Sequence, residues 1–519
     1  MSLQEKLKEY STNKAKELKI LPYRVYSNKV LNDISILSPQ TTEELLDIDG
    51  IGKKKATDYG EDILQLCSGI KATIIEESPK PFTPNELPND INLSDEQQKV
   101  ISLCDEGNNV FMTGPGGTGK SFLIKLLVER YKGVKKVQVC ALTGVAAELL
   151  GLGAKTIHSW SGTGLSRGDK ERILNGIKKN RKNMSDWKKI DILIVDEVSM
   201  MSRKYYDILD FIGRSIRIKH KEKPFGGIQL IFCGDFYQLP PVLDENDPQT
   251  GEFCFESPSW KMTFENVVVL QTIFRQKDPL FTKILKQIRN GKISRKTLAI
   301  LQEKLVDEKT ISENRLDSTI ISPLRSVVKR INDENMDKLD TEEQSYQYTV
   351  IIPENHKPSE KYINYEVCQL RKQMVSDETL HLKKGSRVMC IANIDMHGID
   401  PIVNGSQGII EDFERGVPVV QFKNGVKRIM DYHSWKSDVI PGLEIQQIPL
   451  ILSWAITIHK SQGITLDSAI IDAGNNIFEY GQTYVAFSRL TTLDGLYLKE
   501  FNYRKITTNP KVITYYSSL

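Results

Sequence analysis

Residues 109–131 read NVFMTGPGGTGKSFLIKLLVERY and contain the pattern that decides the fold of the chain around them. The apolar start of this stretch, VFMT, predicts a short buried strand. Gly114 follows, and after four more residues come Gly119, Lys120 and Ser121, which is the spacing of a phosphate-binding loop. The apolar residues after the loop recur at helical intervals. A strand, a glycine-rich loop and a helix in this order predict a site for a nucleoside triphosphate.

The parts of this loop have separate roles toward the nucleotide. Glycines have no Cβ, so the backbone N–H groups can surround the phosphates, and the helix N-terminus adds a favourable dipole. Lys120 is placed at the β- and γ-phosphates, and the Ser121 hydroxyl is placed to ligate Mg²⁺. The expected nucleotide contacts in the loop are Gly114, Gly116, Gly117, Thr118, Gly119, Lys120 and Ser121.

A second apolar run ends in two acids. Residues 190–197 read IDILIVDE, which predicts a buried parallel strand followed by Asp196 and Glu197. Asp196 is placed to hold the Mg²⁺ shell, and Glu197 is placed to polarise the attacking water. With the phosphate-binding loop ahead of them, the two acids indicate that the protein hydrolyses its nucleotide.

Two glutamines are candidates for reading the nucleotide. Gln97 lies three residues after Ser94, and the pair predicts a capping box at a helix N-terminus. Many helicases place an adenine-reading glutamine just ahead of this kind of domain, so both roles remain open for Gln97. Gln238 follows the strand-like run 229–233 and can hydrogen-bond the γ-phosphate. Phe236, in the same loop, is expected to face a channel for a nucleic-acid strand.

Two arginines lie about two hundred residues apart, Arg275 in the stretch LQTIFRQ and Arg489 in VAFSR. A planar guanidinium is the preferred group for the charge that develops on a γ-phosphate. Either arginine alone could form a surface ion pair, but together they indicate a cleft between two domains that closes on the nucleotide. Gln462 and Gly463 suit the same interface.

Small and polar residues after predicted strands are candidates for nucleic-acid contacts. Thr143 and Gly144 follow the apolar run 137–142, at the edge of an open α/β sheet that faces ligands. His158 would offer a hydrogen bond and a stacking face to a single strand, although a lone histidine is usually structural. The expected nucleic-acid contacts are Thr143, Gly144, His158, Ser159, Phe236, His459 and Lys460.

The composition is that of a globular protein. Of the 519 residues, 39% are hydrophobic and 26% are charged, and the formal net charge is only +3, which excludes a polybasic binder. The seven cysteines are scattered without a C-x-x-C pair, so neither a zinc site nor a disulfide framework is expected. The start of the chain is charged, and no apolar run is long enough to span a membrane. These features predict an intracellular protein in a reducing compartment, in the nucleus, the cytoplasm or a viral replication site.

Changes in pattern along the chain divide it into domains. The prediction is a helical accessory domain at 1–75, a proline-containing linker at 76–92, and a first α/β domain at 93–282 with a small basic insert at about 160–188. A second α/β domain is expected at 283–384 and 444–519. Short alternating runs separated by glycine turns predict a small β-barrel inserted at 385–443.

These motifs, in this order, resemble the Pif-type (petite integration frequency) DNA helicases of superfamily 1B. The stretches that carry the resemblance are 207–217, 224–229, 254–260, 274–276, 385–389 and 403–405. The start of the chain is similar to the helicase-and-RNase-D C-terminal (HRDC) domain, on the segment 48–59 above all. This helical domain departs from the usual layout of the family, and a bundle that only contacts the motor or another protein is the alternative.

The resemblance implies two RecA-like domains with ATP and Mg²⁺ between them and single-stranded or forked DNA across their tops. It implies a monomeric helicase that moves 5′ to 3′ in replication, recombination or repair, with no membrane contact. The helical domain would add a DNA contact or a protein partner. An RNA-directed helicase is the runner-up, but the acidic motif reads Asp-Glu-Val-Ser rather than the Asp-Glu-x-Asp of the commonest RNA class. A nucleotide-dependent switch that does not move along the strand is a third reading.

Overall fold

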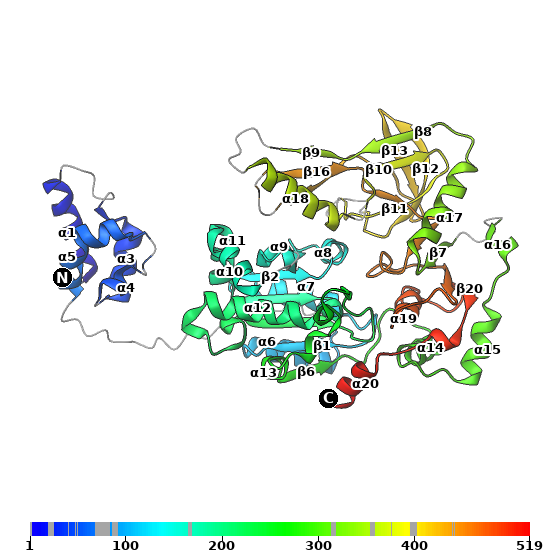
Figure 1. The fold of residues 1–519 in the computed structure, drawn as a ribbon, viewed down its shortest axis with the longest axis horizontal. Coiled ribbons are helices and arrows are strands. Elements are labelled where there is room, and N and C mark those ends of the chain that lie inside the picture. The colour runs from blue at the N-terminus through cyan, green and yellow to red at the C-terminus, as the bar shows by residue number, and fades with distance from the viewer. Residues whose placement is uncertain are drawn as a thin grey trace. The chain divides into compact units, whose positions relative to one another are not determined.

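The computed structural model describes residues 3–18, 25–39, 41–46, 48, 50–67, 84–85, 92–164, 169–312, 318–352, 359–374, 376–394, 402–437, 440 and 442–519. The chain divides into two compact units, Met1–Thr83 and Pro84–Leu519 (Figure 1). Each unit has hydrophobic side chains buried in a core of its own.

The first unit is helical where it is described. Its helices are α1 (Leu3–Glu17), α3 (Asn28–Leu37), α4 (Thr42–Leu46) and α5 (Lys53–Cys67). Leu7, Ile34 and Ile63 have no exposed surface, so helices α1, α3 and α5 share one core. The predicted turn before a basic helix is present, because Gly50 has a φ of +98° and α5 begins at Lys53. Within the part of the chain that is similar to the HRDC domain, residues 21–24 lie outside the described residues.

The first RecA-like domain is a parallel six-stranded sheet with the strand order β3-β2-β4-β5-β1-β6. The strands are β1 (Val110–Thr113), β2 (Val137–Ala141), β3 (Lys155–Thr156), β4 (Ile192–Asp196), β5 (Gln229–Gly234) and β6 (Asn266–Val269). All residues of β1, β4 and β5 are buried, since strands covered on both faces need continuous apolar runs.

Helices connect and cover these strands (Figure 1). They are α6 (Asp95–Asp105), α7 (Lys120–Tyr131), α8 (Gly144–Leu150), α9 (Ile157–Ser161), α10 (Lys170–Lys179), α11 (Arg181–Lys189), α12 (Arg203–Ile216) and α13 (Trp260–Thr263). Short 3₁₀ turns lie at Val198–Met200, Ile218–His220, Pro224–Gly227, Pro248–Gly251 and Cys254–Glu256. The predicted basic insert consists of α10 and α11, which bury Leu174, Ile177 and Trp187 in the core and expose their lysines.

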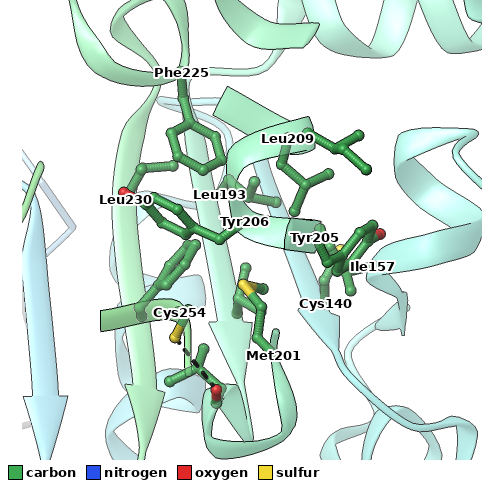
Figure 2. Close-up of a cluster of buried hydrophobic side chains, with 14 of the residues drawn as sticks. Cys140, Ile157, Leu193, Met201, Tyr205, Tyr206, Leu209, Phe225, Leu230 and Cys254 are labelled. Carbon is green, nitrogen blue, oxygen red and sulfur yellow. Dashed lines mark hydrogen bonds between the residues drawn. The ribbon is translucent and has the colours of Figure 1, made fainter. Parts of the chain in front are cut away.

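Aromatic side chains fill the core between the sheet and α12 (Figure 2). Tyr206 packs edge-on against Phe225, with ring centroids 5.3 Å apart, and lies 5.4 Å from the Trp260 ring. The Cys254 thiol donates to the carbonyl of Val198 at 3.6 Å (Figure 2). The cysteines in this core are buried as small apolar groups, which agrees with the absence of a C-x-x-C pair.

The second RecA-like domain has a parallel sheet of four strands in the order β18-β7-β19-β20. The strands are β7 (Thr319–Ser322), β18 (Ala455–Thr457), β19 (Ala469–Ala473) and β20 (Leu496–Phe501). Its helices are α14 (Pro279–Arg289), α15 (Arg295–Glu303), α16 (Glu308–Ser312), α17 (Arg325–Asp337) and α19 (Gln482–Phe487), with a 3₁₀ turn at Tyr503–Lys505. The α/β fold class, with two parallel sheets of this kind, is confirmed.

A large insertion separates α17 from β18. It contains β8 (Glu343–Gln347), β9 (Thr349–Ile351), α18 (Glu360–Gln373), β10 (Thr379–Lys383), β11 (Arg387–Cys390), β12 (Gln407–Glu414), β13 (Val417–Phe422), β14 (Lys427–Ile429), β15 (His433–Lys436), β16 (Glu444–Gln447) and β17 (Leu450–Leu452). Where the sequence predicted one small β-barrel, these strands form a five-stranded sheet, a three-stranded sheet and a two-stranded pair. The insertion also begins before residue 385, because β8 pairs with β10 and β9 pairs with β16. Strand β8 is polar and mostly exposed, so its sequence carried no alternating pattern.

Two predicted domain boundaries also differ in the structure. Helix α14 begins at Pro279, and its Phe281 is buried in the core of the second RecA-like domain. Helix α20 (Pro510–Ser517) follows the last strand of the second domain but packs on the first, where Val512 is fully buried. The predicted boundary at 282/283 therefore divided α14, and sequence order assigned α20 to the second domain although it packs on the first. Among the described helices, none has the length and apolar character needed to cross a lipid bilayer.

Gly213 provides a test of the packing between α12 and the Pro224–Gly227 turn. A Cβ at Gly213 would lie 2.6 Å from the carbonyl oxygen of Phe225, whereas a Cβ at Gly176, inside α10, would have open space around it. Gly213→Ala should therefore lose about 1–3 kcal/mol of stability by overpacking. Gly176→Ala should gain about 0.5–1 kcal/mol from better helix propensity. Urea unfolding followed by tryptophan fluorescence measures both, and equal midpoints for the two variants would contradict the packing described.

Candidate nucleotide site

Residues that are far apart in the sequence meet around one cavity of about 700 Å³ in the second unit. It is lined by Asn92, Gln97, Gly116, Gly117, Gly119, Lys120, Ser121, Phe122, Asp196, Glu197, Gln238, Phe274, Arg275, Gly463 and Arg489. Most of the predicted nucleotide contacts are in this set. Gly114, Thr118 and Gln462 belong to the same segments but do not line the cavity. Its size suits a nucleotide.

The phosphate-binding loop joins β1 to α7. Gly119 precedes the first helical residue, Lys120, and has a φ of +81°. The Lys120 ammonium donates to the carbonyls of Gly114 at 2.8 Å and Pro115 at 2.9 Å, so it lies over the loop. Thr118 is buried and also donates to the Pro115 carbonyl, at 3.0 Å, which stiffens the loop from inside. The loop and its lysine are therefore preformed at a helix N-terminus, where an anion is favoured.

The two acids lie at the end of β4. Glu197 has a left-handed φ of +56°, which is strained for a residue with a Cβ. Its N–H donates to Asp196 Oδ1 at 2.8 Å, and its Oε2 accepts from Gln462 Nε2 at 3.2 Å. This geometry directs the Glu197 carboxylate into the cavity, and Gln462, from the second RecA-like domain, holds it there.

Burial dominates the titration of both acids. It raises the pKa of Asp196, and burial followed by the charge of Asp196 raises the pKa of Glu197 to about 7. The positive charges of Lys120 and Arg489 oppose the shift at Glu197. Ser121 lines the same cavity as Asp196. A hydroxyl and a carboxylate beside a phosphate site are the oxygen ligands that Mg²⁺ takes, so the residues present fit the predicted ion.

The two predicted arginines meet at one residue. Arg275 donates to the carbonyl of Ser488 at 3.1 Å, and Arg489 donates to its hydroxyl at 2.8 Å. Burial lowers the pKa of both arginines, and the charge of Arg275 helps to lower that of Arg489 to about 10. Two buried guanidinium groups on either side of Ser488 form a site in which an anion is stabilised. Gln238 is buried beside them, and its Oε1 has no hydrogen-bond partner in the described protein.

Sequence reasoning missed two aromatic residues at this cavity. The N–H of Gly116 donates to the hydroxyl of Tyr484 at 2.9 Å, so α19 contacts the phosphate-binding loop directly. Phe274 lines the cavity with 49% of its surface exposed, and its N–H donates to the carbonyl of Gly117 at 2.8 Å. Phe274 lies inside the stretch LQTIFRQ and Tyr484 directly precedes the stretch VAFSR, so the nearby arginines were the available signal.

The predicted nucleic-acid contacts differ in their surroundings. Thr143 caps α8 by accepting from the N–H of Ala146 at 3.2 Å, and Gly144 is the first residue of that helix. His158 stacks on Tyr205 at 4.3 Å, and burial lowers its pKa to about 4, so it is neutral near pH 7. Ser159 donates its N–H to the Thr156 hydroxyl inside the same turn.

The prediction for Phe236 is wrong. This side chain is only 1% exposed and packs among the aromatic rings of the core, 5.3 Å from Phe111 and 4.8 Å from Phe255. A residue inside the core cannot contact a nucleic-acid strand. The sequence misled because an aromatic residue in a loop is usually accessible, whereas α20, which comes from a distant part of the chain, covers this loop.

His459 and Lys460 follow β18 in the second RecA-like domain. His459 keeps an exposed surface, but its pKa is lowered, first because neighbouring protein atoms desolvate the ring and then because of the charge of Arg325. Burial is also the largest cause of the lowered pKa of Lys460, which Asp377 opposes. Arg325 is the first residue of α17, so three basic side chains gather near the carboxyl end of β18.

Comparisons with known proteins agree with this geometry. A model of the PIF1-like helicases matches residues 92–299, and a model of the HRDC domain matches residues 1–67. The chain is 34% identical over 454 residues to the ATP-dependent DNA helicase PIF1 of Xenopus laevis, covering 86% of this chain and 67% of that protein. It spans about two thirds of the length of such relatives.

Solved structures give the same result. The Pif1 helicase of Candida albicans matches with a TM-score of 0.67 and 32% identity, over 82% of this chain and 99% of that chain. A Bacteroides Pif1 in complex with ADP-AlF3 and single-stranded DNA matches with a TM-score of 0.60 and 32% identity, over 83% and 97% of the two chains.

The sequence left two roles open for Gln97, helix capping and contact with the nucleotide, and variants at Gln97 and its neighbour Gln98 distinguish them. Gln97 accepts from the Ser94 N–H at 3.2 Å, donates to the Thr118 carbonyl at 3.4 Å and lines the cavity, so capping and nucleotide contact are both available to it. Gln98 is exposed. Gln97→Ala should weaken ATP binding about tenfold without weakening GTP binding, the effect of one lost hydrogen bond. Gln98→Ala is the control, and fluorescent nucleotide titration measures both. Equal weakening of ATP and GTP would assign Gln97 to capping alone.

Proposed function

This chain belongs to the PIF1-like helicases, which are DNA helicases, and we propose that it hydrolyses ATP to move 5′ to 3′ along single-stranded DNA and unwind duplex or forked DNA. The observation that carries the proposal is the single cavity to which both RecA-like domains contribute. The phosphate-binding loop, Glu197 and Arg275 come from the first domain, and Arg489 comes from the second.

The side chains of the cavity divide the work of hydrolysis. Lys120 and the loop N–H groups hold the β- and γ-phosphates, and Glu197 orients a water toward the γ-phosphorus and accepts its proton. Gln238 holds the same water or a γ-phosphate oxygen. Ser121 and Asp196 would hold Mg²⁺, which supplies positive charge against the phosphate oxygens. Arg275 and Arg489 stabilise the charge on the phosphate oxygens as the bond to ADP breaks.

The interface between the domains converts this chemistry into movement. Arg275 of the first domain bonds the carbonyl of Ser488 in the second domain, so an anion beside Arg275 competes for a contact that already joins the two domains. Arg489 bonds the Ser488 hydroxyl from within the second domain and lies next to that contact. ATP would therefore change how the domains close, and phosphate release would reverse the change. Thr143 at the start of α8 and Lys460 after β18 would grip the DNA from the first and second domains in turn.

We propose a separate role for the HRDC unit. Helix α5 begins with the residues Lys53, Lys54 and Lys55 after a glycine turn, a pattern that suits a DNA phosphate. A protein partner is the alternative occupant. Replication, recombination and repair are the processes in which a helicase of this kind would act.

The direction of movement is tested with two partial duplexes, one with a 5′ single-stranded tail and one with a 3′ tail. The protein should unwind the 5′-tailed duplex in the presence of ATP and Mg²⁺, and Lys120→Ala should lose unwinding because it cannot hold the phosphates. Strand separation is measured by gel or by fluorescence. Preference for the 3′ tail would refute the proposed polarity, and ATP turnover without strand separation would favour a nucleotide-dependent switch. Stronger stimulation of turnover by single-stranded RNA than by DNA would favour an RNA-directed helicase.

Glu197→Gln separates nucleotide binding from hydrolysis. The amide retains the shape of the side chain but cannot accept a proton, so ATP turnover should fall by about 10²–10⁴-fold, the usual worth of a general base. ATP binding should persist, since Lys120 and the loop are unchanged. Steady-state turnover and nucleotide titration are the two measurements. Unchanged turnover would show that another group activates the water.

A further inference from the structure

The segment that leads into α20 ties the cores of the two RecA-like domains together. Ile506 is buried in the core of the second domain, and Val512 is fully buried in the core of the first. Between them, the Thr508 hydroxyl donates to the carbonyl of Arg289 at the end of α14, at 2.9 Å. The crossing from one core to the other takes only the residues between Ile506 and Val512, which span at most about 20 Å. Helix α20 is therefore held beside the junction of the two domains.

One hydroxyl of α20 lies between two parts of the nucleotide site. The Tyr516 hydroxyl forms a 2.5 Å hydrogen bond with the Thr113 hydroxyl and accepts from the Phe236 N–H at 3.2 Å. Thr113 is the last residue of β1, directly before Gly114, and Phe236 is two residues before Gln238. Since the phenol accepts from Phe236, its own proton can be donated to Thr113. A single hydroxyl group thus connects the start of the phosphate-binding loop to the loop that carries Gln238.

The Tyr516 ring reaches the second domain as well. It stacks on Tyr237, with centroids 4.9 Å apart and planes 21° apart, and the Arg289 guanidinium lies 4.0 Å from the Tyr237 ring and 5.5 Å from the Tyr516 ring. Arg289 bonds both carboxylate oxygens of Asp235, at 2.8 and 3.0 Å, and Asp235 has no exposed surface. Because Arg289 belongs to α14, the loop 235–238 is held from the second domain and from α20 together.

We propose that Tyr516 is a positioning residue for ATP hydrolysis. Its hydrogen bonds to Thr113 and Phe236 fix the position of Gln238 relative to the phosphate-binding loop. Its ring contacts with Tyr237 and Arg289 hold these two loops in place against the second RecA-like domain. It does not touch the nucleotide cavity. This role rests on the proposed ATP hydrolysis and adds a residue from a helix that no nucleotide motif includes.

The hydroxyl should affect turnover more than binding. The phosphate-binding loop has other support, since Thr113 also accepts the Leu270 N–H at 2.7 Å and the loop continues into α7. The Phe236 N–H has the Tyr516 hydroxyl as its partner, and Gln238 depends on the same short loop. Loss of the hydroxyl therefore displaces Gln238 while ATP can still bind, which lowers kcat and leaves KM nearly unchanged.

The matched variants are Tyr516→Phe and Tyr515→Phe, each in the full chain. Tyr515 lies on the same helix, stacks on Phe255 at 4.4 Å and accepts from Trp260 Nε1 at 3.1 Å, so its variant also loses one hydrogen bond of α20. Tyr516→Phe should lower kcat for DNA-stimulated ATP turnover about tenfold at similar KM, whereas Tyr515→Phe should stay within about twofold of the unaltered protein. Thermal unfolding midpoints of the two variants should match, since both lose one partly buried, hydrogen-bonded hydroxyl of α20.

A transition-state analogue adds a readout that a purely structural role would not change. Tyr516→Phe should weaken binding of ADP with aluminium fluoride but not binding of ADP, because only the former needs an aligned Gln238. Thr113→Val, which removes the other hydroxyl and keeps the Tyr516 ring, should reproduce the loss and serves if Tyr516→Phe does not fold. Equal kcat in the Tyr516 and Tyr515 variants, with an active unaltered protein, would overturn the positioning role. No ATP turnover by the unaltered protein would overturn the proposed function and this inference with it.

Discussion

Helix α19 lies so close to the first RecA-like domain that no side chain fits at the start of the contact. A Cβ at Gly481 would lie 2.5 Å from the carbonyl oxygen of Gln238, and Gly481 has a φ of +73°, which glycine adopts readily. This approach brings Tyr484 to the phosphate-binding loop and Arg489 to the cavity. The nucleotide site depends on this contact, because neither domain alone supplies both the loop and the second arginine.

The nucleotide site brings together charged side chains that are buried. Asp196, Glu197, Arg275 and Arg489 all have pKa values shifted by burial toward the neutral form. Isolated charges of this kind destabilise a fold. The negative charge of a triphosphate would compensate the two arginines, and its cation would compensate the two acids. Binding would therefore relieve the unfavourable buried charges of the free protein. The Asp235–Arg289 pair is different, because its two hydrogen bonds already compensate the charges and leave it a structural role.

The insertion and α20 show how elements outside the two sheets act on them. Asn393, in the insertion, donates its side-chain amide to the carbonyl of Glu148 in α8 at 2.7 Å, so the insertion contacts the helix that Thr143 begins. Helix α20 contacts a different part of the same domain, next to β1 and the loop 235–238. The first RecA-like domain is therefore held by three segments that follow it in the chain: α19, α20 and the insertion.

Features whose chemistry is local could be predicted from short stretches of the chain. The phosphate-binding loop, the acids after β4 and the capping box at Ser94 depend on neighbouring residues, so spacing and residue type were enough to predict their elements. The motifs also predicted the family, and the similarity to PIF1-like helicases confirmed it. Apolar runs predicted the central strands because parallel strands are buried on both faces.

Which surfaces of these elements stay accessible depends on packing between segments that are distant in the chain. Phe236 was expected at a DNA channel but is buried. No pattern in the sequence indicated a role for Tyr516. Both results depend on α20, which crosses back to the first domain. The polar strand β8 and the true start of the insertion were missed, since strand pairing, rather than apolar pattern, defines them. Long-range packing sets these features, and it leaves little trace in a local stretch of sequence because each contact is shared between segments far apart in the chain.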